Sequence, residues 1–495
     1  MNFSKFSNLQ KPFHRQLVYV WLLLVSVSIN AQVGIGTTDP QPSSILEIKS
    51  NSQGLLVPRM TTAERTAIVD AANSLLVYDT DLKTYFYYDD APSNSKWIKI
   101  SSEFQKRNNF KLVKSVADLA PELASGGGSK YLLDTNTFYE INGTINLAFP
   151  IDLNNAYISG VNTNKDILVR TSGNVFTGTN GGSIKNLTIT GGGTVFQITG
   201  GTTLIVQNTI ISNMASVGTI SNVWMYFGNI IQYLNNNAGI TYSNISNLLL
   251  SNQGWFDSNK GTYEKFTGTF GLIEKVSGFS TANGSAVAMD FSSNPTVSNG
   301  VILNVAFSGT STQYVKGYAP APYVGYNFTN KWTVNCPGIP HESDGVATGD
   351  IVLDLGVGSS VSTTFTGTGA SSRKKLSGTT ISNNLLRFEK SGDNKIIYRG
   401  SKKRYFQVNA SLSFQSTTNN ATIYIFYIAK GSGSGAASVV LDSKVYGRTA
   451  SSTTYSSVPI VATIELGKDD YIEVWAERYS GSAQMNVHSL SLSAQ

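Results

Sequence analysis

The middle of the chain repeats a pattern of short apolar strands and asparagine turns. Asn186, Asn208, Asn229 and Asn252 follow one another at intervals of 22, 21 and 23 residues, and alternating apolar residues precede most of them. A unit of this length is about one coil of a parallel β-helix, in which an Asn at a turn can bond to the Asn of the next coil. The pattern predicts a right-handed β-helix over 105–345. A β-sandwich with coincidental spacing is the alternative.

The C-terminal part of the chain alternates apolar and polar residues with a period of two. This alternation is clear over 406–414 and 458–466, and a polar turn follows at 467–470. The apolar phase slips between Val487 and Leu490, which indicates a β-bulge. Seven or eight such strands predict a two-sheet jelly roll, preceded by a Gly/Ser/Thr-rich linker, within 346–495.

One strand of this sandwich is apolar on both faces. Tyr424, Phe426 and Ile428 alternate with residues that are equally apolar. An outer sheet face of this kind should be covered, and a threefold contact between chains would cover it. We therefore expect these three residues at the interface of a homotrimer.

The first 31 residues have the features of an export signal. Lys5, Lys11 and Arg15 precede an apolar run over 17–29, and no acidic residue occurs before Gln32. The run is short for a membrane span. We expect a signal peptide at 1–31 and a secreted or cell-surface protein without an integral membrane segment after cleavage; a single membrane anchor is the alternative. The glycines of GIGTT at 34–38 follow this cut rather than a strand, so they do not form a phosphate loop.

The sequence of residues 32–104 predicts a small module of helix and strands. We expect this module to attach the protein or to cap its end. Thr61 and Glu64 have the spacing of a capping box for a helix that runs to about residue 72. A short strand over 54–60, a hairpin over 74–88 and a strand over 97–100 complete it. Such a core is small and could need partner chains for stability.

Three segments resemble known families. "VGIGTTDP", "GLLVPRMTTAER", "LLVYDTD" and "KWIKI" resemble a module of secreted and surface proteins of Bacteroidota and segments of phage tail fibres. The stretch from "DLNNAYISG" to "NCPGIPHESDG" resembles phage proteins with a pectate-lyase-like β-helix. "ATIYIFYIAKG" and "LGKDDYIEVW" resemble the TNF-like or complement-type jelly roll that ends many trimeric fibres. These resemblances imply a trimeric, exported, fibre-like protein.

The charge of the C-terminal part narrows the classes of ligand that it could bind. Residues 346–495 carry 15 basic and 10 acidic side chains, an excess too mild for a nucleic-acid binder and suited to an acidic surface glycan. Two basic runs could dock such a glycan, although solvated loop tips are the alternative. The runs consist of Arg373, Lys374, Lys375, Lys402, Lys403 and Arg404.

Enzyme chemistry has weaker support. A hydrolase needs paired carboxyl groups, and a lyase needs a base, often with calcium. The candidates Asp257, Glu264, Glu274 and Asp290 are scattered along the chain. The run 341–344 (HESD) offers three ligand types on one loop, which indicates a solvated linker rather than a metal site. We expect no cofactor, and a lone cysteine, Cys336, indicates a buried residue rather than a disulfide framework.

The sequence thus predicts a fibre-like adhesin or surface structural protein, trimeric, that binds a surface carbohydrate or another surface ligand through its C-terminal domain. Two alternatives stay open. One is a β-helix polysaccharide lyase or hydrolase, and the other is a purely structural filament or coat subunit.

Overall fold

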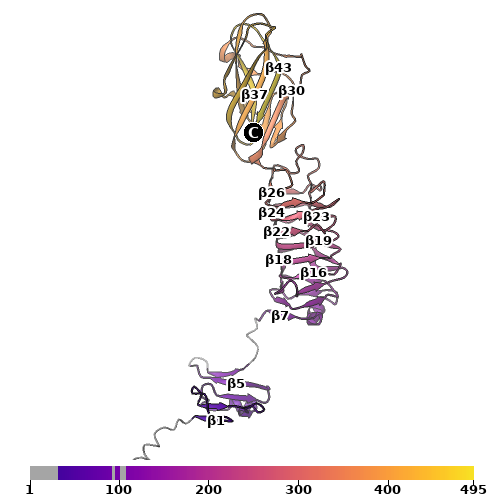
Figure 1. Cartoon of the computed structure of the whole chain (residues 1–495), viewed down its shortest axis with the longest axis vertical. Coiled ribbons are helices and arrows are strands. Elements are labelled where there is room, and N and C mark those ends of the chain that lie inside the picture. Colours follow the sequence, from indigo (N-terminus) through magenta and orange to yellow (C-terminus); the bar gives the residue numbers. More distant parts are fainter. Residues whose placement is uncertain (1–31, 92–94, 101–107) are drawn as a thin grey trace, which may run out of the picture. The chain divides into compact units, whose positions relative to one another are not determined.

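The computed structural model describes residues 32–91, 95–100 and 108–495, so the expected signal peptide lies outside the described residues. The chain divides into two compact units, one ending at Arg107 and the other beginning at Asn108. Both consist mainly of β-strands, as Figure 1 shows for the second unit. Among the described residues, no helix is long and apolar enough to cross a membrane.

The N-terminal unit contains a two-stranded parallel sheet, a separate four-stranded sheet and a short helix. The capping box at Thr61 and Glu64 is present, but helix α2 (Thr62–Thr66) ends earlier than the sequence predicts, and only Arg59–Met60 of the strand expected at 54–60 forms. The hairpin of β4 and β5 is confirmed. The two-stranded sheet consists of β1 (Val33–Ile35) and β2 (Leu46–Ile48), and the four-stranded sheet consists of β3 (Arg59–Met60), β4 (Leu76–Asp79), β5 (Thr84–Asp89) and β6 (Lys96–Lys99).

A buried ion pair holds helix α2 on the sheet. The Nε of Arg65 lies 2.9 Å from the Oδ2 of Asp79, and both side chains are almost fully buried. The guanidinium also lies 3.9 Å from the ring centroid of Phe86. Because buried charges need such partners, this contact fixes the helix in a module whose apolar core is small.

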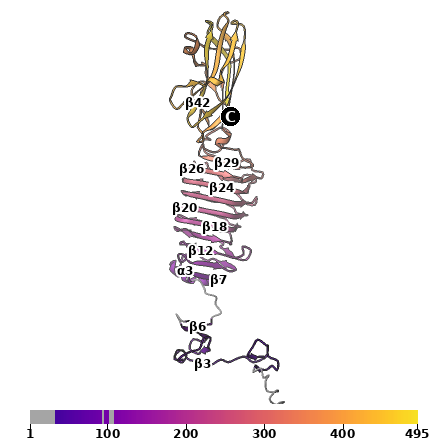
Figure 2. The same cartoon turned by 90° about the vertical axis from the view of Figure 1, so that its left-hand side faces the viewer.

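The second unit begins with a parallel β-solenoid, which confirms the predicted β-helix architecture (Figures 1 and 2). Paired residues on successive coils, such as Gly218, Ile240 and Glu264, are 22 and 24 positions apart. One sheet consists of β8 (Tyr131–Leu132), β11 (Ile151–Asp152), β14 (Asn174–Gly178), β17 (Thr194–Ile198), β19 (Ser216–Ser221), β21 (Ile240–Ser243), β23 (Thr262–Thr267), β25 (Val287–Asp290) and β28 (Val315–Lys316).

The other sheet wraps the remaining faces, because its long strands bend at a left-handed residue and pair on both sides of the bend. Its strands are β7 (Phe110–Val113), β9 (Phe138–Ile141), β10 (Thr144–Asn146), β12 (Tyr157–Ser159), β13 (Ile167–Val169), β15 (Gly182–Lys185), β16 (Thr188–Thr190), β18 (Gly201–Ser212), β20 (Val223–Leu234), β22 (Asn247–Trp255), β24 (Thr269–Thr281), β26 (Thr296–Leu303), β27 (Ala306–Ser308) and β29 (Trp332–Asn335). Helices η1 (Val116–Leu119) and α3 (Ala120–Ser125) pack on the core at the first coil.

Asparagines occupy the left-handed corners. The Nδ2 of Asn208 donates to the Oδ1 of Asn186 at 3.2 Å, as the repeat predicts. A second corner stacks Asn235 on Asn213 at 2.6 Å, which the sequence pattern did not reveal. At one coil the left-handed residue is Ile230, with φ of 53°, rather than the expected Asn229. A β-branched residue is strained there.

Two antiparallel sheets form the C-terminal sandwich and enclose a second apolar core. The predicted bulge is present, as a register shift between Ser413 and Phe414 opposite β43. The first sheet contains β30 (Thr348–Leu353), β31 (Val361–Thr363), β33 (Thr380–Ile381), β34 (Leu385–Leu386), β37 (Arg404–Ser416), β41 (Ser456–Leu466) and β43 (Met485–Ala494). The second contains β32 (Lys374–Lys375), β35 (Phe388–Lys390), β36 (Ile396–Tyr398), β38 (Thr422–Ser432), β39 (Ser438–Val439), β40 (Val445–Thr449) and β42 (Asp470–Ser480). Short 3-10 turns are η2 (Asp344–Val346), η3 (Gly369–Ser372) and η4 (Leu441–Ser443).

A buried arginine joins the sandwich to the last solenoid coil. Arg387 donates from Nη1 to the carbonyl of Thr329 and to the Oδ1 of Asn330, both at 2.9 Å, and from Nη2 to the carbonyl of Trp332. Its Nε lies 3.4 Å from the Oδ1 of Asp344. The segment 341–344 is therefore part of a packed joint, and the expectation of a solvated linker there is wrong: Glu342 is buried and accepts backbone N–H groups of residues 327 and 328.

Candidate functional site

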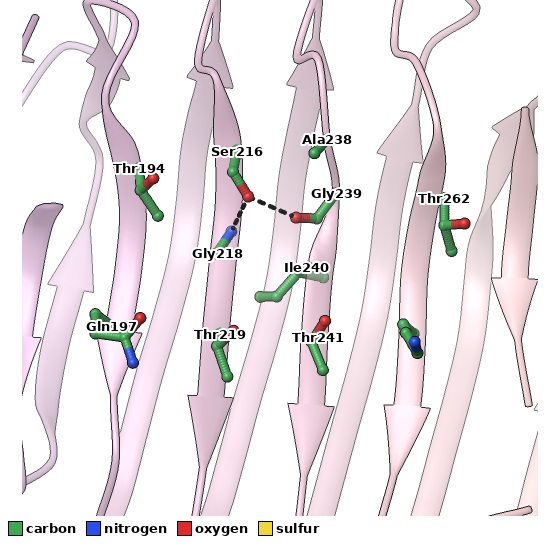
Figure 3. A pocket seen from close by; sticks show the side chains of 11 residues that line it. Thr194, Gln197, Ser216, Gly218, Thr219, Ala238, Gly239, Ile240, Thr241 and Thr262 are labelled. Atoms are coloured by element: carbon green, nitrogen blue, oxygen red, sulfur yellow. Dashed lines mark hydrogen bonds between the residues drawn. The ribbon is translucent and has the colours of Figure 1, made fainter. Parts of the chain in front are cut away.

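A polar groove crosses the outer face of the nine-stranded solenoid sheet (Figure 3). Strands β17, β19, β21 and β23 form its floor. The strand register places Gln197, Thr219, Thr241 and Lys265 beside one another on four successive coils. Adjacent strands are about 4.8 Å apart, so these side chains form a row of hydrogen-bonding groups with that repeat.

Two glycines of the groove lining lie where the backbones of neighbouring coils approach closely. A Cβ on Gly218 would lie 2.1 Å from the carbonyl oxygen of Phe196, and one on Gly239 would lie 1.9 Å from that of Tyr263. Ser216 bridges them, because its Oγ accepts from the Gly218 N–H at 3.0 Å and donates to the Gly239 carbonyl at 3.3 Å (Figure 3). The groove has a volume of about 400 Å³.

The groove can bind but is poorly supplied for acid–base chemistry. Its described lining offers hydroxyl, amide and ammonium groups and contains no carboxylate. A glycoside hydrolase needs two carboxyl groups on either side of the scissile bond. The groove therefore fits a polar chain that runs along the solenoid and supplies no acid–base pair of its own.

The structure does not bring the four candidate catalytic carboxylates together at an exposed site, because Glu264 and Asp290 are buried. Glu264 points into the solenoid interior, fully buried, with its Oε2 2.9 Å from the Nζ of Lys275. Glu274 points outward on β24, where it pairs in register with Leu249 and Val301. Asp290 lies at the end of β25 beside Lys265 in register, and its Oδ1 accepts from the backbone N–H and the hydroxyl of Ser292.

Asp257 is exposed in the turn after β22. Because Glu264 and Glu274 point to opposite sides of the solenoid wall, these two residues cannot share a substrate. The aromatic residues near them divide in the same way: Trp255 and Trp332 are buried in the core, and Trp224 is exposed.

Three of the six basic residues predicted to bind ligand are paired with acids of the same chain. Hydrogen bonding to Glu477 raises the pKa of Arg373, and Glu465 raises that of Lys403. Lys375 pairs with Glu473. Lys374 donates to the carbonyl of Thr364. The other two residues of these runs are Lys402, which is exposed, and Arg404, which donates to the carbonyl of Asp344.

The three residues expected at a trimer interface lie inside the sandwich of a single chain. Tyr424, Phe426 and Ile428 are fully buried members of its core. The opposite face of β38 is also covered within the chain, because Tyr427 donates to Glu477 and contacts Arg373. A partner chain is therefore not needed to bury this strand. Two apolar faces on one strand reflect a covered sheet rather than an interface.

An exposed aromatic pair on the same sheet was not singled out by the sequence. Tyr446 on β40 and Tyr479 on β42 meet edge to face, with ring centroids 5.7 Å apart. They come from the strands on either side of β38, and each is about half exposed, at 55% and 52%. Arg448, also exposed, lies two residues beyond Tyr446 on the same strand.

Comparison with known proteins gives one family match. Residues 34–115 match the phage tail like trimerisation region. This match supports a phage tail-fibre-like architecture and assembly of the chain as a homotrimer. It covers the N-terminal unit and ends just after β7. No curated protein matches the chain.

Several solved structures are similar at low identity. Murine APRIL is 12% identical, covers 30% of this chain and 98% of its own, and has a TM-score of 0.20. Bacteriophage CBA120 tailspike protein 4 is 9% identical over 88% of this chain and 77% of its own, also at 0.20. Pantoea stewartii WceF, a glycan biofilm modifying enzyme, is 8% identical over 89% and 70%, at 0.19. At these TM-scores the similarities carry no functional inference.

Proposed function

We propose that this protein is an exported, homotrimeric surface fibre that binds a cell-surface carbohydrate through its C-terminal sandwich. The match of residues 34–115 to a trimerisation region supports the assembly. A solenoid of stacked coils provides a long, stiff shaft. Three copies of a weak binding site on one particle would give a strong multivalent attachment.

The tyrosine pair supports the carbohydrate proposal best. Tyrosine presents a flat apolar ring and a polar hydroxyl at low conformational-entropy cost, so exposed tyrosines suit ligands that are apolar on one face and polar at the edge, as sugars are. Tyr446 and Tyr479 offer two such rings at an angle to each other. Arg448 adds a cation, and no described acidic side chain forms a salt bridge with it. This surface suits an acidic glycan better than the two basic runs do, because several cations of those runs are already paired within the chain.

The test is a glycan array and whole-cell binding with the chain produced without residues 1–31. Tyr446→Ala and Tyr479→Ala should each abolish or strongly weaken the signal, and Arg448→Gln should weaken binding of acidic glycans only. Tyr405→Ala is the matched control, because Tyr405 is an exposed tyrosine, at 66%, on the other sheet. A folded protein that binds no glycan and no cell surface would refute the adhesin proposal and leave the structural-subunit alternative.

A second candidate function follows from the groove in Figure 3. Its row of polar side chains could bind a linear polysaccharide along the shaft, which is the first requirement of a polysaccharide-degrading enzyme. Product release from acidic polysaccharides, measured as reducing ends or as absorbance of unsaturated products, tests this candidate. Asp290→Asn should abolish release, since Asp290 is the predicted carboxylate in register with the groove residue Lys265. Glu274→Gln, on a different face, is the control.

Export is proposed from the N-terminal segment. Sequencing the N-terminus of the protein recovered from the cell surface or medium should give Gln32 as the first residue. Recovery of an intact Met1 in the cytoplasm would contradict export and would leave the fibre architecture untouched.

A further inference from the structure

An outward-facing column of apolar side chains runs along the solenoid. The strand register aligns Phe110 with Phe138, Phe138 with Tyr157, and Tyr157 with Ser183 on successive coils. The column continues through Ile205, Phe227 and Leu249. Ser183, between Tyr157 and Ile205, is polar and buried, so it interrupts this alignment. We call the six apolar residues Phe110, Phe138, Tyr157, Ile205, Phe227 and Leu249 the apolar column.

The members of the column point away from the core. On β18, Leu204 and Val206 are fully buried, while Ile205 between them is only partly buried. Tyr157 is 48% exposed, and the rings of Phe110 and Phe138 stack against each other at 5.9 Å on the outer surface. Side chains in a strand alternate between the two faces, so these residues are on the solvent side of the wall.

Neighbouring outward columns have the polar character expected of a soluble surface. Two residues further along the same strands, the column contains Lys185, Gln207, Asn229 and Ser251. On the opposite sheet, the corresponding outward column is the groove row that includes Thr219 and Thr241. The apolar column is therefore a property of one stripe of the solenoid rather than of its whole surface, and such a stripe marks an interaction site.

We propose that the apolar column is the surface through which three copies of this chain contact one another along the shaft. The proposal rests on the homotrimer of the proposed function. Its first member, Phe110, lies within the 34–115 match to a trimerisation region, so the column continues into the shaft from residues already assigned to assembly. A C3 assembly brings the same face of each copy toward the axis, and a stripe parallel to the shaft fits that symmetry.

The proposed contact has a defined end. After Leu249 the next member in register is Glu274, and three carboxylates facing one axis would repel one another. From β7 to β22 the column spans six strand spacings, or about 29 Å at about 4.8 Å each. We therefore infer that the shafts contact one another over the coils before β24.

Site-specific photocrosslinking in the chain without residues 1–31 tests the proposal. A benzophenone amino acid replaces Phe227, which preserves an aromatic side chain, and a second variant carries it at Ile205. The control variant carries the benzophenone amino acid at Thr219. This residue is on β19 of the opposite sheet, between β18 and β20 in the chain. Light scattering before irradiation establishes whether each variant is a trimer.

Covalent dimers and trimers at positions 227 and 205, with only monomer bands at 219, would support the proposed surface. Trimers in solution that crosslink at neither 227 nor 205, or equally at 219, would overturn the surface while the homotrimer stands. A monomer of the unmodified chain would refute the homotrimer and the surface together. If the variant at position 227 were a monomer while the unmodified chain was a trimer, the crosslink at position 205 would decide. A crosslink there would support the surface, and its absence from a trimeric 205 variant would overturn the surface.

Discussion

Removal of Arg387 should open the joint between the solenoid and the sandwich. The Arg387 side chain is 1% exposed, and it donates three hydrogen bonds to residues 329, 330 and 332 of the solenoid end. It also lies beside the carboxylate of Asp344, whose Oδ2 accepts the backbone N–H groups of Ser401 and Lys402. One side chain thus fixes both sides of the joint.

The expected cost follows from these contacts. Hydrogen bonds with a charged donor contribute about 1.5–3 kcal/mol each, but their effects are not additive because water replaces some of them. Removing one partner of a buried ion pair costs about 3–5 kcal/mol, since the other charge is left without compensation. We take about 3–5 kcal/mol for Arg387→Ala.

Hydrogen exchange measures this cost locally. Each 1.4 kcal/mol corresponds to about a factor of ten, so the amides of β29 should lose protection by roughly 140- to 3,700-fold. Arg399→Ala is the control, because Arg399 is an arginine at the same joint whose ion pairs to Glu389 and Asp469 are partly exposed, with the Arg399 side chain 32% exposed. Its effect should be below about 1 kcal/mol. Equal, small effects of both variants would refute the assignment of the joint to Arg387.

Three further predictions concern single positions. Ile230→Asn should stabilise the solenoid by about 1 kcal/mol in thermal unfolding, because Ile230 is left-handed where Asn is tolerated; no gain would contradict strain there. Asn236→Ala should cost about 2–3 kcal/mol of unfolding free energy, because buried Asn236 bonds to the Met214 N–H, the Ile211 carbonyl and Asn259; a cost below that of exposed Asn208→Ala would contradict it. Burial raises the pKa of Asp79, but hydrogen bonds from Leu82, Arg65 and Thr62 lower it to about 2. Because the folded pKa lies below the ordinary 3.8, this stabilisation is complete above about pH 4 and is lost as the pH falls toward 2. Circular dichroism of the N-terminal unit should show that loss, and Asp79→Asn should remove it.

Period and spacing predicted the elements with regular internal repeats. The asparagine interval predicted stacked coils, because a left-handed corner selects Asn at the same position of each coil. The phase slip between Val487 and Leu490 predicted the bulge, because one extra residue reverses the facing of every later side chain. Both signals depend on residues close together in the chain, so they can be detected in a single sequence.

Contacts between distant segments could not be predicted in this way. The sequence offers Glu264 as a candidate catalytic carboxylate, but its strand turns the side chain inward onto Lys275. The double-sided apolar strand at 424–428 is covered by residues near 373 and 477, which lie far away in the chain. The tyrosine pair is equally remote in sequence, since Tyr446 and Tyr479 meet only because both strands flank β38. The residues of the apolar column align only once the register of each coil is known.

The mass of the chain without residues 1–31, measured by light scattering during size-exclusion chromatography, tests the central claim most directly. The fibre account predicts three times the mass of one chain at every concentration measured, as the trimerisation match supports. A mass of one chain, from protein whose circular dichroism shows a folded β structure, would contradict it.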